Sequence, residues 1–235
     1  MTEKIGEMPL LDHLEELRTR LIRVLAFLGL LLLLCFIFNE PLTRWLLVPL
    51  GEVQLIFTRP EEPFLAALKV AFGAALTFTL PLLLREALLF ALPGLSRKER
   101  KYFIPLTFFS FPLFLGGALF AYSFLLPMGL RFLIGFGIPE IKPMLSIGNY
   151  VDFAFLMLIA TGLAFQLPPV LFFLAALGLV GPVKLRKWRK YALLISFVAG
   201  GVLTPSTDVF TQSLLAGALY CLYELSLLVI LLARK

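Results

Sequence analysis

Acidic side chains stand among arginines and lysines in two polar segments of an otherwise apolar chain. The first segment is PLLDHLEELRTR at residues 9–20, which contains Glu16 and Arg20. The second is SRKERK at residues 96–101, in which Glu99 is the only acid. Glu16 can form a structural i, i+4 ion pair with Arg20. Alternatively, Glu16 and Glu99 can approach each other and bind an incoming cation, and arginine fits best because its planar fork bonds a carboxylate bidentately.

Further polar side chains fall within or beside apolar runs, where they are energetically expensive. Gln166, in GLAFQLPPV, precedes two prolines. It can steady a proline kink through an interhelical hydrogen bond, or it can provide a polar spot in a cavity that receives a partner. Arg85 and Glu86 follow an apolar run and are typical of an interfacial pair whose arginine snorkels to phosphate. Asp208 is most simply a helix cap.

Enzymatic and metal chemistry are not predicted. His13 is the sole histidine, and Cys35 and Cys221 lie in apolar runs without the spacing of metal ligands or a disulfide framework. The net charge is +6, but the basic residues cluster between apolar runs. This placement is typical of membrane topology rather than of nucleic-acid binding. We therefore expect no catalytic residues, no metal, no cofactor and no nucleic-acid partner.

The elements that must position these side chains are membrane-spanning helices. The chain is 60% hydrophobic and 15% charged, with a mean hydropathy of +0.95, whereas soluble proteins carry roughly 25% charged residues. The fifth apolar segment has 13 residues, too few to cross an undistorted bilayer. The tight link TPSTD predicts that it forms a short hairpin with the sixth. We predict one domain, residues 1–235, with spans at about 21–38, 64–84, 103–127, 151–178, 191–203 and 209–232.

The basic residues predict the orientation of these spans. Fifteen of the 21 lysines and arginines fall in the N-terminal segment, the loop at 96–101, the segment at 184–190 and the C-terminal tail. Positive charge is retained on the cytoplasmic side. Both termini are therefore expected in the cytoplasm.

Six stretches of the sequence, in order, resemble the TatC family, the polytopic receptor subunits of the twin-arginine protein translocase. They are PLLDHLEELRTRL (9–21), FALPGLSRKERKYFIPL (90–106), GALFAYSFLLP (117–127), GLAFQLPPV (162–170), LTPSTDVFTQ (203–212) and LYELSLL (222–228). The resemblance implies an all-α fold with six transmembrane helices in a glove-like concave bundle, of which helices five and six are short. It also implies a multi-pass protein of the plasma (inner) membrane.

The resemblance further implies that the cytoplasmic surface binds twin-arginine signal peptides of folded cargo. In that family the contact uses an acid that matches Glu99 and an N-terminal acid that matches Glu16, with the adjacent Glu15 as the alternative. Arg18 and Leu10 match further positions of the same N-terminal motif. With partners, such a subunit supports export driven by the proton-motive force.

Other positions that the family uses can be placed on this chain in the same way. Pro49, Phe90 and Asp208 match positions at which the family is functionally sensitive. Two positions depart from the family pattern, because Gln166 stands where a glutamate is frequent and Glu86 stands where an amide is expected. Gln166 and Glu86, together with the three sensitive positions, are expected along the translocation path on the concave face of the bundle.

The resemblance also implies partners. Thr204 and Gln212 fall in the region where the single-span subunits TatA and TatB dock, and a homo-oligomer within the receptor complex is expected. The main rival is a proton-coupled secondary transporter or channel with Glu86, Gln166 and Asp208 along its path. Against this rival stands the lack of self-similarity between the two halves of the chain, since many transporters are built from inverted repeats.

Overall fold

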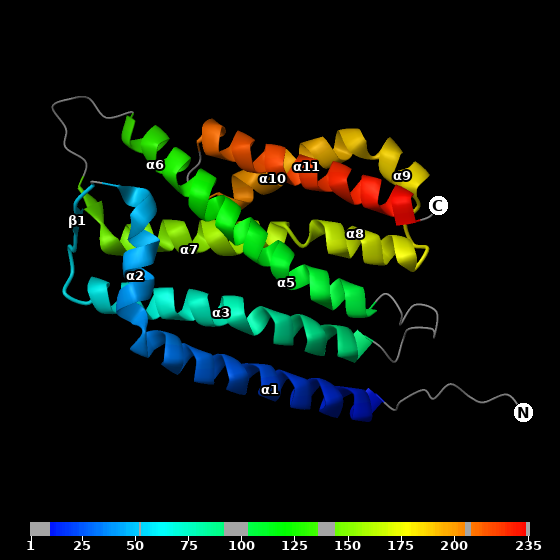
Figure 1. Ribbon diagram of the computed structural model, residues 1–235, viewed down its shortest axis with the longest axis horizontal. Helices are drawn as coiled ribbons and strands as arrows, with labels where there is room; N and C mark the ends of the chain where they lie inside the picture. Colours follow the sequence, from blue (N-terminus) through cyan, green and yellow to red (C-terminus); the bar gives the residue numbers. More distant parts are fainter. Residues whose placement is uncertain (1–9, 52, 92–102, 136–143, 205–207, 234–235) are drawn as a thin grey trace, which may run out of the picture.

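The computed structural model describes residues 10–51, 53–91, 103–135, 144–204 and 208–233, and these are almost entirely helical. Two short strands, β1 (Leu55–Ile56) and β2 (Leu145–Ser146), pair in parallel. The helices are α1 (Leu10–Ile37), α2 (Asn39–Leu47), α3 (Glu62–Ala91), α5 (Phe103–Phe120), α6 (Leu126–Gly135), α7 (Ile147–Ala164), α8 (Leu167–Ala176), α9 (Pro182–Lys187), α10 (Arg189–Leu203) and α11 (Val209–Ala233) (Figure 1).

Among the described residues, five helical segments are long and apolar enough to cross a membrane, in agreement with the five long spans predicted. α10 has 15 residues, which is about 22 Å of helix, so this helix is short as expected. The expectation of a short final helix is wrong, because α11 continues for 25 residues. Its apolar sequence contains no proline that would end the helix earlier. The membrane candidates are Asp12–Ile37, Glu62–Ala87, Phe108–Gly135, Ile147–Ala176 and Val209–Leu232.

The charged N-terminal segment is helical, as its i, i+4 pair predicts. α1 starts at Leu10 and continues into the apolar run predicted at residues 21–38. The charged segment and the apolar run are therefore one continuous helix. Because of this continuity, the side chains of Glu16 and Arg20 are held on a rigid element rather than on a loop.

Two of the long helical segments are interrupted near prolines. The fourth span breaks at Phe165 and Gln166, and α8 restarts with prolines in its first turn. A proline inside a helix removes a hydrogen bond and clashes with the carbonyl four residues earlier, so the break is expected there. A π-helical turn at Ala121–Leu125 joins α5 to α6 just before Pro127. Such single π turns accommodate an irregularity without ending the helix.

α1 begins and α11 ends at the same end of the molecule, where α3 also ends and α5 begins (Figure 1). We call this the basic end, because it carries Arg20 and Arg23 of α1, Arg85 of α3 and Arg186 of α9. The other end, which we call the opposite end, holds α2, the two strands and the end of α6 (Figure 1).

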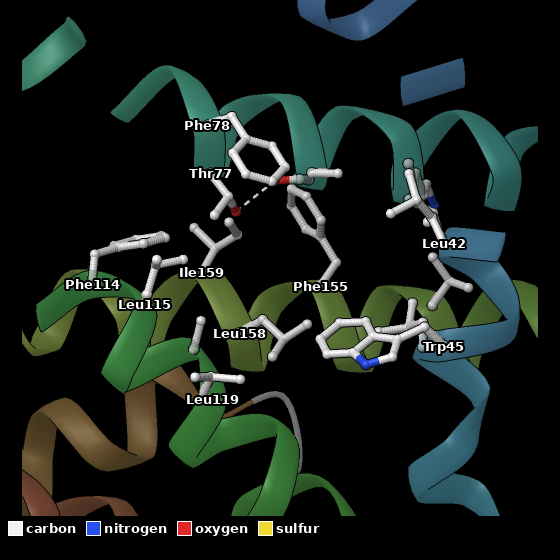
Figure 2. Close-up of a pocket in the computed structure, with 17 residues that line it drawn as sticks. Leu42, Trp45, Thr77, Phe78, Phe114, Leu115, Leu119, Phe155, Leu158 and Ile159 are labelled. Carbon is white, nitrogen blue, oxygen red and sulfur yellow. Dashed lines mark hydrogen bonds between the residues drawn. The ribbon is translucent and has the colours of Figure 1, made fainter. Parts of the chain in front are cut away.

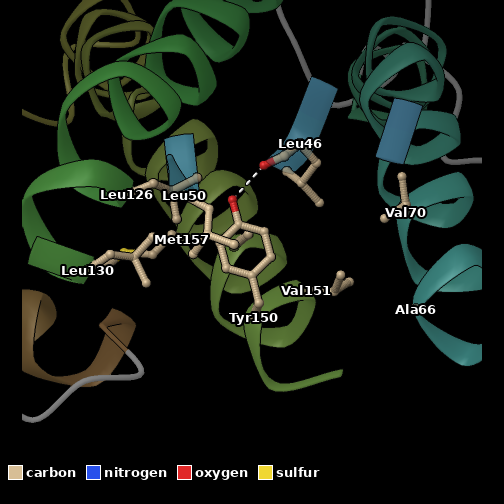
Figure 3. Packing of buried hydrophobic residues seen from close by; sticks show 10 residues of the cluster. Leu46, Leu50, Ala66, Val70, Leu126, Leu130, Tyr150, Val151 and Met157 are labelled. Carbon is tan, nitrogen blue, oxygen red and sulfur yellow. Dashed lines mark hydrogen bonds between the residues drawn. The ribbon is translucent and has the colours of Figure 1, made fainter. Parts of the chain in front are cut away.

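The largest buried apolar cluster lies toward the opposite end, where α2 packs across α3, α6 and α7 (Figure 3). Tyr150 of α7 is fully buried in this cluster, and its hydroxyl donates a hydrogen bond of 2.5 Å to the carbonyl oxygen of Leu46. This bond satisfies a buried polar group and ties α2 to the bundle.

Candidate functional site

The first turns of α1 lie against the last turns of α3 at the basic end. On α3, Glu86 and Phe90 are four residues apart and therefore share one helix face. That face meets His13 and Arg20, which lie seven residues apart on α1. The rings of His13 and Phe90 stack with their centroids 4.1 Å apart. The two helices are thus joined by an aromatic contact next to an ionic one.

Glu86 is the centre of the ionic contact. Its side chain is only 2% exposed, and both of its oxygens accept hydrogen bonds from arginines. Oε2 accepts from Nη1 of Arg20 at 2.8 Å. Oε1 accepts from Nη1 of Arg23 at 3.0 Å and from Nη1 of Arg85 at 2.8 Å. A carboxylate at this depth is tolerated only when it is paired in this way.

Glu16 accepts hydrogen bonds from the two nitrogens of Arg20 that do not contact Glu86. Its Oε1 accepts a hydrogen bond from Nε of Arg20 at 3.1 Å and a second from Nη2. Its other oxygen, Oε2, is 3.8 Å from Nδ1 of His13 and has no hydrogen-bond donor among the residues that the structure describes. We call Glu16, Arg20, Arg23, Arg85 and Glu86 the arginine cluster.

A polar hollow of about 390 Å³ opens on the α1 side of the arginine cluster. Carboxylates outnumber cations on its walls, so the hollow is suited to a cation. A guanidinium is the cation that Glu16 already binds, through two donors that converge on its Oε1. The hollow is lined by Asp12, Glu15, Glu16, Thr19, Arg20 and Arg23.

The predictions at the basic end have mixed outcomes. The i, i+4 pair of Glu16 and Arg20 is confirmed. The pair of Arg85 and Glu86 is also present, and Glu86 is buried within the protein. Sequence reasoning missed that Arg20 and Arg23 reach Glu86, because these arginines precede it by more than 60 residues.

Three other residues predicted at this site are placed only in part. Arg18 is exposed on α1. Leu10 is the first residue of α1, but its side chain lies outside the described part of the chain. Glu99 lies within 92–102, outside the described residues.

Gln166 lies at the break between α7 and α8. Its Nε2 donates a hydrogen bond of 3.0 Å to the carbonyl oxygen of Ser110 in α5. The interhelical hydrogen bond that the sequence predicted beside the prolines is therefore confirmed. Roughly 15 Å of helix separates Gln166 from the end of α8 at the basic end.

The remaining predicted residues lie toward the opposite end and do not approach Glu16. Oδ1 of Asp208 accepts a hydrogen bond of 2.6 Å from the backbone N–H of Thr211, which confirms the predicted cap of α11. Nε2 of Gln212 donates to the carbonyl oxygen of Phe197 at 2.9 Å and joins α11 to α10. Thr204 is buried at the end of α10, and Pro49 lies in a 3-10 turn after α2.

An apolar groove runs between α2, α3, α5 and α7 and holds a cavity of about 240 Å³ (Figure 2). Aliphatic side chains form most of its walls, together with aromatic side chains such as Trp45, Phe78 and Phe155. Lys69 on its wall forms an ion pair of 2.5 Å with Asp152 of α7. The sequence offered no signal for this pair, because its two members lie on different spans.

These features define a multi-pass helical membrane protein with a buried ionic cluster at one end. Residues 12–217 match the family described as Sec-independent protein translocase protein (TatC). The chain therefore belongs to the TatC family. This membership makes it a subunit of the Sec-independent protein translocase, and it favours that role over a small-solute transporter or an enzyme.

Relatives and solved structures agree with this assignment. The chain is 41% identical over 217 residues to the TatC protein of Synechocystis sp., covering 92% of this chain and 85% of that one. It is 38% identical over 234 residues to the TatC protein of Aquifex aeolicus, covering 97% of each. A crystal structure of the twin-arginine translocase receptor TatC in DDM superposes with a TM-score of 0.81 at 36% identity, covering 92% of this chain and 98% of that one.

Within the described residues, no group of three or more histidine, cysteine, aspartate or glutamate side chains could hold a metal ion. The chemistry that the basic end offers is the binding of cations by carboxylates.

Proposed function

We propose that this chain is the translocase subunit that binds the twin-arginine signal peptides of folded proteins, and that it does so at the basic end. The observation that carries this proposal is that Glu16 already holds a guanidinium, that of Arg20, through two donors. The same geometry suits an arginine that arrives from outside the chain. On this proposal the basic end and both termini face the cytoplasm, and the protein lies in the plasma (inner) membrane.

Glu99 is proposed as the second carboxylate. It lies in the sequence between Ala91 of α3 and Phe103 of α5, and both of these residues are at the basic end (Figure 1). A pair of arginines needs two acceptors, and Glu16 supplies one. Arg18 and Leu10 belong to the same stretch of α1 as Glu16 and are proposed as further contacts of the peptide.

The apolar stretch of a signal peptide needs a path into the membrane. The groove between α3, α5 and α7 is apolar along most of its length (Figure 2), and we propose that the peptide enters as a hairpin along this side toward Gln166. On this proposal the path starts near Glu86 and Phe90 and ends near Pro49 and Asp208, although none of the four lines the cavity itself. Gln166 is an amide, so it cannot relay protons.

Passage of a folded protein requires partners, because a bundle of this size cannot enclose one. We propose that TatA/TatB-like single-span subunits dock on α10 and α11 near Thr204 and Gln212. A homo-oligomer forms the receptor complex, and the proton-motive force drives export. The short α10 favours local thinning of the bilayer, since a helix of 15 residues does not match its full thickness.

Binding of a labelled twin-arginine signal peptide to the purified full-length protein in detergent tests the proposal. The variants are Glu16→Gln and Glu99→Gln, each of which removes one charge with little change in shape. Loss of one charge-assisted hydrogen bond costs about 1.5–3 kcal/mol, so each variant is expected to raise Kd roughly ten- to hundredfold.

A twin-lysine peptide and the variant Glu224→Gln are the controls. Glu224 also pairs with an arginine, Arg189, but on α10 and α11. Its removal is expected to leave Kd unchanged. Equal binding of the two peptides to the unmodified protein, unaffected by Glu16→Gln and Glu99→Gln, would refute the receptor proposal.

A further inference from the structure

Arg20 has the position that a signal arginine would need. Its guanidinium directs Nε and Nη2 at Glu16 and Nη1 at Glu86, so one side chain bridges two carboxylates. A bidentate contact with a signal arginine uses both oxygens of Glu16, so Arg20 must first give up its two bonds to Oε1. The chain therefore carries an internal competitor for its own binding site.

The two carboxylates hold Arg20 unequally. The pair with Glu16 lies within one turn of α1, where the side chains are 18% and 25% exposed. Ion pairs of this i, i+4 type change an equilibrium constant by only about a factor of two. Glu86 is 2% exposed, and one hydrogen bond to such a charged group changes an equilibrium constant by a factor on the order of ten to a hundred. Arg20 is thus expected to leave Glu16 while it stays on Glu86.

The charge balance of the arginine cluster also indicates that Glu86 helps to free Glu16. Three arginines face two glutamates, which leaves a formal charge of +1. Without the charge of Glu86 the same arginines would face Glu16 alone, with a formal charge of +2. Arg20 and Arg23 would then both be attracted to Glu16, and an arriving arginine would meet a stronger repulsion.

We propose that Glu86 is a positioning residue for signal recognition: it retains Arg20 so that Glu16 can exchange the internal guanidinium for one of the signal peptide. This inference rests on the proposed function. Glu86 touches no arginine of the peptide. It acts through Arg20, and it sets how readily Glu16 becomes free.

A double-mutant cycle on the full-length protein tests the inference. The variants are Glu86→Gln, Arg20→Gln and their combination, and the readout is Kd for the twin-arginine peptide, with the twin-lysine peptide as control. Glu86→Gln is expected to weaken binding several-fold, because Arg20 then remains on Glu16 and the formal charge of the arginine cluster rises to +2, and Glu86→Asp is expected to restore part of the loss. Arg20→Gln is expected to tighten binding about twofold, which is the factor by which the i, i+4 pair competes for Glu16.

The combined variant separates positioning from a merely structural role. If Glu86 acts through Arg20, Glu86→Gln weakens binding much less in the Arg20→Gln background than in the unmodified protein. An equal effect in both backgrounds would overturn the inference, as would unchanged binding by the single Glu86→Gln variant. Glu224→Gln again serves as the matched loss of a paired carboxylate.

Two results keep the inference separate from the receptor proposal. If the unmodified protein does not prefer the twin-arginine peptide, the receptor proposal fails and the inference fails with it. If the unmodified protein prefers the twin-arginine peptide and its binding depends on Glu16, the receptor proposal stands. The double-mutant cycle then tests only the role of Glu86. If Glu86→Gln does not fold, Arg20→Gln is decisive, since Glu86 then keeps Arg23 and Arg85. Unchanged or weaker binding by Arg20→Gln refutes the inference.

Discussion

Replacement of Gly117 by alanine tests the close approach of α5 and α7. Gly117 is buried in α5, and a Cβ atom at this position would lie 2.7 Å from Cγ of Phe165 and 2.8 Å from the carbonyl oxygen of Thr161. Neither neighbour is the free end of a flexible side chain. The helices must therefore separate, or Phe165 must move together with the adjacent Gln166.

The adjacent Gly116 offers a matched control. It lies in the same helix, but a Cβ atom there would have nothing within 4 Å. Alanine gains about 1 kcal/mol over glycine in a helix interior, and this gain is common to both positions. The difference between the two variants therefore isolates the overpacking cost, which is about 1–3 kcal/mol. We expect Gly116→Ala to be more stable than the unmodified protein and Gly117→Ala to be less stable than Gly116→Ala by that amount.

Unfolding of the purified protein in mixed micelles, titrated with a denaturing detergent and followed by circular dichroism, measures this difference. Both variants should give single transitions with equal slopes and different midpoints. Equal midpoints would refute the reasoning, because they would mean that α5 and α7 have room for a methyl group at Gly117. A lower midpoint for Gly116→Ala alone would contradict it as well.

Two further substitutions probe single hydrogen bonds. Tyr150→Phe leaves the buried carbonyl oxygen of Leu46 without its donor, so the free energy of unfolding should fall by about 1–3 kcal/mol; an unchanged detergent-unfolding midpoint would contradict this. Gln166→Glu replaces the amide that donates to the carbonyl oxygen of Ser110 by an acid that can donate only while protonated. The melting temperature of this variant should fall as pH rises, whereas that of the unmodified protein should not change in parallel.

Local patterns predicted much of what the structure contains. The i, i+4 spacing of Glu16 and Arg20 predicted their ion pair, and Asp208 before an apolar run predicted a cap. Both interactions are local, so their geometry follows from the helix itself. The polar amide of Gln166 beside two prolines predicted a hydrogen bond to another helix, but it did not predict which helix would accept it.

Hydropathy marks where the apolar run of a helix begins, and the helix itself can begin earlier. α1 extends to Leu10 because charged residues continue a helix as well as apolar ones do when they lie outside the hydrocarbon core. The expectation that the last helix is short came from the resemblance to a family and not from the residues. The uninterrupted apolar run of α11 contradicts it.

The sequence alone determined that this is a multi-pass membrane protein, because several of its apolar runs are long enough to cross the hydrocarbon core of a bilayer. Proline marked the irregularity beside Gln166, but it did not decide which helices break, because α3 and α5 continue through Pro81 and Pro112. Only the tertiary structure decided what surrounds Glu86. Its environment depends on how α1 and α3 pack, which brings Arg20 and Arg23 to a residue more than 60 positions away. Such contacts depend on the rotation and depth of two whole helices, which short-range spacing does not encode.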